Sequence, residues 1–339
     1  MLAKISLPFY IVICLLITIE GCKTDKQKKT AETDEEFELQ FSRFEVDMFD
    51  TINNDARLES LRKKHGTFTD LVLKQVIGLR TENDTVLVTE LKQYTSDKYI
   101  YEVYQEVRSQ YQNTDWLEEG LKEGFVKYHE LFPKKLIPEV KTFICPFNYN
   151  TIASDSVLGI GLDMYLGADY KYYPTAGFPL FKIRKLRKEY IISDAIAAWM
   201  QSDYQPDENN NDLLNNMVHE GKILYALNEI LPDVEDSLKF GFTQSQLEWC
   251  QKNEVNLWQF FLENKLLFNK NTGEYIKFIN DGLTTSGFPK EAPSRLGVFI
   301  GLKIVQQYMS KHEETTLPQL MELKDAGKML IESGYKPTK

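Results

Sequence analysis

The sequence predicts a mainly helical protein with a small β-sheet, which places it in the α+β class. Most of the chain has the apolar spacing and end signals of helices. Two segments in the middle, Val140–Cys145 and Val157–Leu166, have the composition and alternation of strands instead. Hydrophobic residues make up 42% of the chain, which is ample for a core.

The first 21 residues have the layout of a secretory signal peptide. Lys4 precedes an apolar run, Ile5–Ile19, and Gly21 stands directly before Cys22. The run is shorter than the roughly 20 apolar residues that span a bilayer. A cysteine after a small residue is typical of a bacterial lipoprotein, so we predict lipidation of Cys22, although Glu20 stands where a small residue is usual. An uncleaved N-terminal anchor is the alternative interpretation.

The mature chain is predicted to consist of a tether, residues 22–36, and one soluble domain, residues 37–339. Lys23–Glu36 is charged and has no aromatic or branched aliphatic side chain, so it cannot bury enough apolar surface to fold. No second linker follows Phe37. The net charge of −10 argues against a nucleic-acid partner, because nucleic acid requires a basic face.

The helical pattern predicts nine helices, and several carry recognisable end or packing signals. Asp115 and Glu118 form a cap-like pair, Thr243 and Gln246 a capping box, and the GxxxG that begins at Gly297 is typical of close helix packing. The predicted helices are Asp55–Lys64, Asp70–Gly78, Ser96–Tyr111, Asp115–Leu131, Glu189–Met200, Asp212–Leu231, Thr243–Phe268, Arg295–Ser310 and Pro318–Glu332.

The second predicted strand contains two glycines on one face. Leucine, isoleucine and methionine side chains alternate there with Gly159, Gly161 and Asp163. Glycine inside a strand indicates that something approaches the backbone closely. That neighbour is a ligand, a packed helix or a bulge, so these three residues are candidates for lining a cleft.

An incomplete HExxH motif lies in the predicted helix Asp212–Leu231. His219 and Glu220 occupy the positions of a zinc ligand and a general base, but Ile223 occupies the position of the second ligand. Isoleucine has no lone pair to donate. Glu254, on the following helix, adds at most one further ligand, whereas catalytic zinc normally has three from the protein. We therefore expect no metal, no cofactor beyond the covalent lipid, and no catalytic residue.

Glu220 lies within a stripe of apolar residues at helical spacing, and it needs a partner there. A buried carboxylate must be paired, hydrogen-bonded or protonated. Lys222 or Arg295 could neutralise it, and Arg295 is the better partner because its guanidinium fork matches a carboxylate. Alternatively, Glu220 and Arg295 face a ligand. The other stripe residues are Leu213, Met217, Leu224, Leu227 and Leu231.

Two further features leave alternatives open. The basic run Lys182–Lys188 could face anionic lipid, a protein partner or only solvent. Cys145 and Cys250 remain after the signal peptide and the lipidated cysteine are set aside. A disulfide between them is allowed outside the cytoplasm, but their spacing cannot establish one.

Five long strings of this sequence resemble the gliding-motility lipoprotein GldB family, in the same order and over nearly the whole mature domain. They are Arg43–Phe49, Leu158–Gly167, Asn215–Asp233, Phe242–Phe268 and Gly287–Met309. The resemblance implies a lipid-anchored accessory protein of bacterial gliding motility and type 9 secretion. We expect it to be non-catalytic and to act through protein–protein interaction with other cell-envelope proteins of that machinery.

That family in turn resembles zincin-like peptidases, of the gluzincin type, whose HExxH has decayed. The resemblance implies that the glycine-bearing strand Leu158–Leu166 is the edge strand lining a peptide cleft beside the helix of His219 and Glu220. A partner peptide would bind there by strand addition. The alternative is a zinc-dependent metallopeptidase with an atypical metal site.

Lys23 and Thr24 do not resemble an inner-membrane retention signal, which favours the outer membrane, facing the periplasm.

Overall fold

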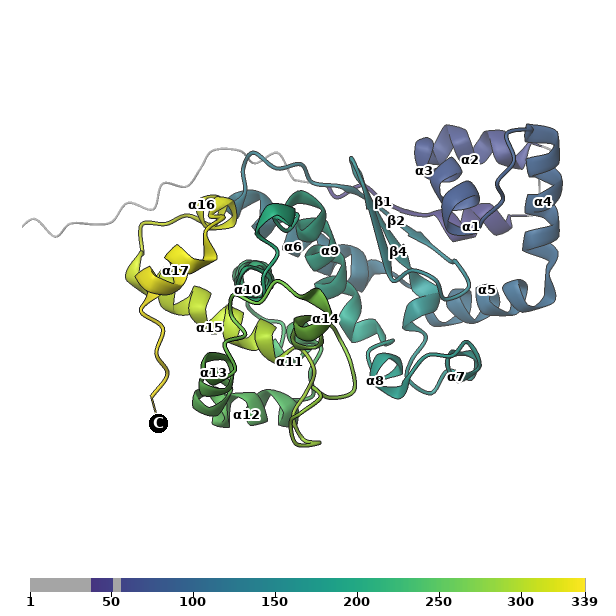
Figure 1. The fold of residues 1–339 in the computed structure, drawn as a ribbon. Helices are drawn as coiled ribbons and strands as arrows, with labels where there is room; N and C mark the ends of the chain where they lie inside the picture. The colour runs from purple at the N-terminus through teal and green to yellow at the C-terminus, as the bar shows by residue number, and fades with distance from the viewer. Residues whose placement is uncertain (1–37, 51–55, 339) are drawn as a thin grey trace, which may run out of the picture. The chain divides into compact units, whose positions relative to one another are not determined.

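The computed structural model describes residues 38–50 and 56–338, which fold mainly into helices beside one small sheet (Figure 1). Residues Glu38–Lys339 cluster as one compact unit. The predicted signal peptide, Cys22 and the tether lie outside the described residues. Within the described part, no helix combines the length and apolarity that a bilayer crossing requires.

The sheet in the described part has four strands in the order β1-β2-β4-β3. The strands are β1 (Phe41–Arg43), β2 (Glu139–Phe143), β3 (Thr151–Ser154) and β4 (Val157–Gly161). β1, β2 and β4 run parallel, and β3 runs antiparallel to β4, from which only Asp155 and Ser156 separate it. Mixed pairing of this kind agrees with the predicted α+β class.

The two predicted strands correspond to β2 and β4, with two corrections. The second strand ends at Gly161 rather than Leu166, because η2 (Leu162–Tyr165) is a 3₁₀-helix. β4 is also not an edge strand, since it pairs with β2 on one side and β3 on the other. The prediction of an edge strand at Leu158–Leu166 is therefore wrong, and the free edge on that side of the sheet belongs to β3.

The N-terminal part is helical, and side-chain caps define its helix boundaries. Asn83 caps α4 and Asp97 caps α5, so two helices stand where we predicted only Ser96–Tyr111. α6 has the predicted bounds, but Asp115 and Glu118 do not cap it. The elements are α1 (Phe44–Phe49), α2 (Arg57–His65), α3 (Thr67–Asp70), the π-helix η1 (Leu71–Val76), α4 (Asp84–Ser96), α5 (Lys98–Gln110) and α6 (Asp115–Leu131).

The C-terminal part contains the helix of the HE motif. The capping box of Thr243 and Gln246 is confirmed, but Asn253 divides the predicted helix 243–268 in two. The elements are α7 (Tyr172–Thr175), α8 (Leu180–Ile183), η3 (Lys188–Tyr190), α9 (Ile191–Asp203), η4 (Glu208–Asn210), α10 (Leu213–Ile230), α11 (Asp236–Phe240), α12 (Gln244–Lys252), α13 (Glu254–Glu263), α14 (Thr272–Tyr275), η5 (Ile276–Phe278), α15 (Leu296–Lys311), α16 (Leu317–Glu322) and α17 (Ala326–Ser333).

α10 and α15 pack with their backbones in contact. A Cβ atom at Gly221 would lie 2.6 Å from the carbonyl oxygen of Gly301, and one at Gly301 would overlap the carbonyl of Met217. A Cβ atom at Gly297 would lie 2.9 Å from the oxygen of Phe278. The GxxxG prediction of close packing is therefore confirmed, and this seam fixes the position of the HE motif.

Both cysteine thiols in the described part, Cys145 and Cys250, are buried and free. The disulfide that the sequence left open is not formed. Burial raises the pKa of the Cys250 thiol to about 12. The thiol is therefore protonated at neutral pH and inaccessible to reagents, which indicates a packing role.

Candidate functional site

α10 begins where the sequence predicts and carries both residues of the HE pair. Asp212 accepts a hydrogen bond of 2.9 Å from the backbone N–H of Asn215, which caps the helix. The predicted apolar stripe is buried along α10, whereas Glu220 is only half-buried, with 22% of its side chain exposed. His219 is likewise half-buried. The helix therefore presents the HE pair at the margin of the core.

Glu220 pairs with Arg295, as the sequence predicts. Nη2 of Arg295 lies 3.2 Å from Oε2 of Glu220, and its Nη1 donates a hydrogen bond of 3.0 Å to the carbonyl oxygen of Phe240. Arg295 stands at the N-terminus of α15 in the left-handed conformation, with φ of 59°. The alternative partner, Lys222, instead donates to the carbonyl oxygens of Met321 and Leu323. The pair thus links α10 to α15 and α11.

His219 faces a different environment from Glu220. It lines a cavity of about 460 Å³ together with residues of α16, α17 and the segment 203–209. Burial lowers the pKa of its imidazole, which favours the neutral form. Ile223, one turn further on, is 2% exposed and belongs to the core. The position that would hold a second imidazole is therefore filled by an aliphatic packing residue.

Glu254 does not complete a metal site with His219. Its Oε1 accepts a hydrogen bond of 2.9 Å from the hydroxyl of Tyr335, whose ring packs against Trp258. Glu254 is not among the residues that line the cavity of His219. In residues 38–50 and 56–338, no group of three His, Cys, Asp or Glu side chains is placed to hold a metal ion. In the described part, His219 and Glu254 therefore do not converge on one site.

The two glycines of β4 are explained by the β3–β4 hairpin. A Cβ atom at Gly159 would lie 2.5 Å from the side chain of Ile152, and one at Gly161 would overlap the carbonyl of Tyr149. The close neighbour that the glycines indicate is therefore the chain's own hairpin. Neither glycine is among the residues that line the cavities beside Asn150 and Ser154.

Asp163 is fully buried and holds the loop that leads into the hairpin. Its carboxylate accepts a hydrogen bond of 2.7 Å from the backbone N–H of Phe147 and two of 3.3 Å from that of Cys145. Burial raises the pKa of Asp163 to about 6. Because Phe147 has φ of 65°, the carboxylate stabilises a turn that would otherwise be strained. Asp163 is a structural residue and not a cleft residue.

The outer edge of β3 carries unpaired backbone groups. The N–H of Gly161 donates to the carbonyl of Asn150, and opposed residues in antiparallel strands alternate between bonded and non-bonded pairs. Ile152 and Ser154 therefore bond to β4, whereas the N–H and C=O groups of Thr151 and Ala153 point outward. Within the described residues, no other backbone segment bonds to these outward groups.

One cavity lies beside the residue that precedes β3, and another touches the last residue of the strand. Asn150, directly before the strand, lines a cavity of about 340 Å³ that also includes Arg295 and Lys185. Ser154, at the other end, lines a cavity of about 270 Å³ beside α3 and η1. The edge strand β3 thus lies between two cavities, and Arg295, the partner of Glu220, lines one of them.

The sequence analysis missed a polar pair beside Arg295, which joins the half-buried Asp194 to the buried Tyr165. Asp194, on α9, lines the same cavity as Arg295, and its carboxyl accepts a hydrogen bond of 2.9 Å from the hydroxyl of Tyr165. Burial raises the pKa of Asp194 to about 6. A single acidic residue within the apolar run IISDAIAAWM was the available signal. It does not reveal the partner, which lies 29 residues away in η2.

The fold and the site together define a mainly helical α+β protein whose α10 carries the HE pair, with Ile223 in place of a second histidine. The chain belongs to the family of the gliding motility protein GldB, whose model matches residues 24–337. No curated protein and no solved structure matches the chain. Membership confirms the resemblance and indicates a role in gliding motility as a lipid-anchored protein of the cell envelope. A zincin-like core remains a prediction.

Proposed function

We propose that this protein is a non-catalytic accessory component of gliding motility and type 9 secretion, which binds an extended segment of another envelope protein by strand addition to β3. The observation that carries the proposal is the free edge of β3. Two residues there, Thr151 and Ala153, direct backbone donors and acceptors outward, and such an edge is a template for pairing with another chain. The cavities at the two ends of β3 offer room for side chains of the added segment.

The surroundings of the HE helix support the non-catalytic part of the proposal. Glu220 is engaged by Arg295, and Glu254 is engaged by Tyr335. Ile223 is part of the core. A general base must reach a metal-bound water, and a metal needs converging donors, so this arrangement supports a protein without peptidase activity.

The predicted location, on the periplasmic side of the outer membrane, is part of the same proposal.

The strand-addition hypothesis is tested by Ala153→Pro. Proline removes an outward N–H of β3 without removing a bond to β4, and edge strands tolerate proline at such positions. Ala153→Val, which keeps the N–H, is the matched control. We expect cells that depend on Ala153→Pro to lose gliding at a normal protein level, and cells with Ala153→Val to glide. Normal gliding of the proline variant would refute strand addition at β3.

The metallopeptidase alternative is tested separately by metal analysis of protein purified without chelator. We expect no stoichiometric zinc and near-normal gliding of His219→Ala. One zinc per chain that is lost in His219→Ala would favour the peptidase. Gly159→Leu does not serve as a cleft test, because its side chain would collide with Ile152 and disturb the fold. Cys22→Ala is expected to abolish gliding through loss of the lipid anchor.

A further inference from the structure

The segment Lys171–Lys188 concentrates positive charge in an otherwise acidic protein. It carries six basic side chains and no acidic one, although the whole chain has a net charge of −10. It includes the basic run whose environment the sequence left open. The six are Lys171, Lys182, Arg184, Lys185, Arg187 and Lys188.

The same segment exposes an apolar apex, which we define as Phe178–Phe181. Leu180, at the start of α8, is 80% exposed, and Pro179 is also exposed. Phe178 and Phe181 are half-buried. A large apolar side chain that stands this far out of the core contributes nothing to packing within the chain. Its setting among basic residues indicates contact with something outside the chain.

Aromatic contacts support the apex from behind. Tyr173 lies 5.9 Å from Phe178 and 5.1 Å from Tyr170, as measured between ring centroids. Tyr172 continues this series to Tyr99 of α5, which is 65% exposed. Figure 1 shows α7 and α8 as short neighbouring helices, drawn below α5 in this view. The apex is therefore a supported projection with further aromatic surface beside it.

Part of the positive charge in this segment is available to an external partner. Lys171 pairs with Glu102, and Lys185 pairs with Asp281. Lys182, in contrast, is half-buried, has its ammonium nitrogen 4.5 Å from the ring centroid of Phe178, and makes no ion pair with a described residue. Lys188 is exposed and also makes no ion pair in the described part. Both lysines follow the apex in sequence, Lys182 directly and Lys188 six residues later.

We propose that the Phe178–Phe181 apex and the two lysines that follow it, Lys182 and Lys188, rest on an anionic phospholipid surface. Apolar and aromatic side chains enter the interfacial region of a bilayer, while lysines above them meet the negative headgroups. A single projecting leucine suits a deformable lipid surface better than a protein pocket, which would require a larger apolar patch. Phe181 and Lys182 also line the cavity of about 340 Å³ beside Asn150, but the proposal does not rest on strand addition at β3. Contact of the apex with lipid would hold the lipid-anchored domain in a defined orientation.

The test places a polarity-sensitive fluorophore at the apex of the full-length lipidated protein. Leu180→Cys introduces an accessible thiol, while Cys145 and Cys250 are buried. Ile331→Cys is the matched control, because Ile331 is also 80% exposed. We expect the label at position 180 to shift to the blue and to be quenched by a lipid-embedded quencher on vesicles of phosphatidylcholine with about one-third phosphatidylglycerol. On phosphatidylcholine alone it should remain in water, as the label at 331 should on both.

Charge reversal then tests the role of the lysines. Each lysine near an anionic surface raises the equilibrium constant for contact between the apex and the bilayer about fivefold. The double variant Lys182→Glu with Lys188→Glu should therefore lower that constant by at least about 25-fold. Lys270→Glu with Lys290→Glu, at exposed positions elsewhere, should leave it unchanged. Equal signals at 180 and 331, or no effect of reversal, would overturn the proposal. A label that stays in water on vesicles but is shielded in cell envelopes would assign the apex to an acidic protein instead.

Discussion

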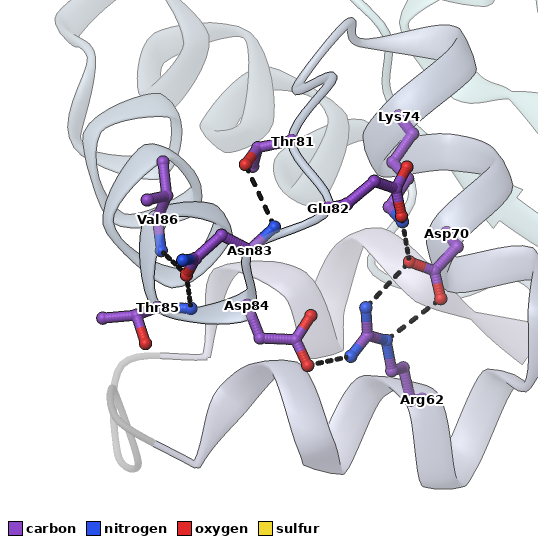
Figure 2. Close-up of polar contacts among 9 residues, drawn as sticks. All are labelled: Arg62, Asp70, Lys74, Thr81, Glu82, Asn83, Asp84, Thr85 and Val86. Carbon is purple, nitrogen blue, oxygen red and sulfur yellow. Dashed lines mark hydrogen bonds and ion pairs between the residues drawn. The ribbon is translucent and has the colours of Figure 1, made fainter.

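Close backbone packing joins α10 to α15, whereas partly exposed ion pairs join the N-terminal helices at their surface. At the seam, Gly221 and Gly301 bring two helix backbones into contact, and little besides glycine fits. Between α2, α3 and α4, Arg62 donates to Asp70 and to Asp84, as Figure 2 shows. Arg62 and Asp70 are about one-third exposed. Interactions should therefore be costly to change at the seam, where water is excluded, and inexpensive to change at the surface.

The largest effect is expected from Gly301→Ala. The added methyl group would overlap the backbone carbonyl of Met217, which cannot rotate away, so α10 and α15 must separate. We expect a loss of about 4 kcal/mol in the free energy of unfolding, measured by urea denaturation. Gly327→Ala is the control, because its methyl group would lie 3.4 Å from Asp325 and meets ordinary contacts. Similar stability of the two variants would contradict the account of the seam.

A partly buried charge should also have a large effect, and Asp194, which lines the cavity beside Arg295, tests this. Its pKa is raised by burial to about 6 from 3.8, so the folded chain binds a proton more tightly than the unfolded chain. Stability then falls as pH rises from about 4 to about 6, by up to about 3 kcal/mol for this carboxyl.

Asp194→Asn should remove that share of the pH dependence. Asparagine keeps an acceptor for the hydroxyl of Tyr165 and cannot ionise. The measurement is the urea midpoint between pH 4 and 7, with Asp169→Asn as a control at an exposed position. Asp163 shifts in the same direction, so a residual slope is expected. An unchanged slope in Asp194→Asn would show that its charge is not buried as the structure places it.

The same contrast explains what the sequence could and could not predict. The capping box at Thr243, the GxxxG that includes Gly301 and the Glu220–Arg295 pair were predicted, because short spacing or complementary chemistry specifies each of them. β1 and β3 were missed, since strands of three or four residues are defined by their partners: Phe41 pairs with Val140, far along the chain. The partner of Asp194 was missed for the same reason.

The sequence pattern also gave no indication of the boundary between α12 and α13. The apolar spacing continues through the predicted helix 243–268, but the structure divides it at Asn253, whose side-chain amide donates to the carbonyl of Trp249. An asparagine that bonds back to the preceding turn competes with the helix. The separation of Glu254 from His219 follows from tertiary packing onto Tyr335. Sequence spacing could place these two residues on successive helices but could not show whether they meet.

The smallest effect is expected at the surface network of Figure 2. Nε of Arg62 lies 3.0 Å from Oδ2 of Asp70, and its Nη2 lies 2.9 Å from Oδ1, which is a two-pronged geometry. The Arg62 guanidinium lowers the pKa of Asp70. Even so, partial exposure screens the pair, so a double-mutant cycle of Arg62→Ala and Asp70→Asn should give a coupling energy of about 0.5 kcal/mol.

Salt distinguishes this pair from the interactions of the seam. At 1 M NaCl the screening length is about 3 Å, so the Arg62–Asp70 coupling should fall by about half or more. The cost of Gly301→Ala should not fall, because steric overlap does not depend on ions. A coupling energy near 2 kcal/mol that persists in salt would mean that the N-terminal helices exclude water around Arg62. The seam and this surface network would then not differ in their access to water.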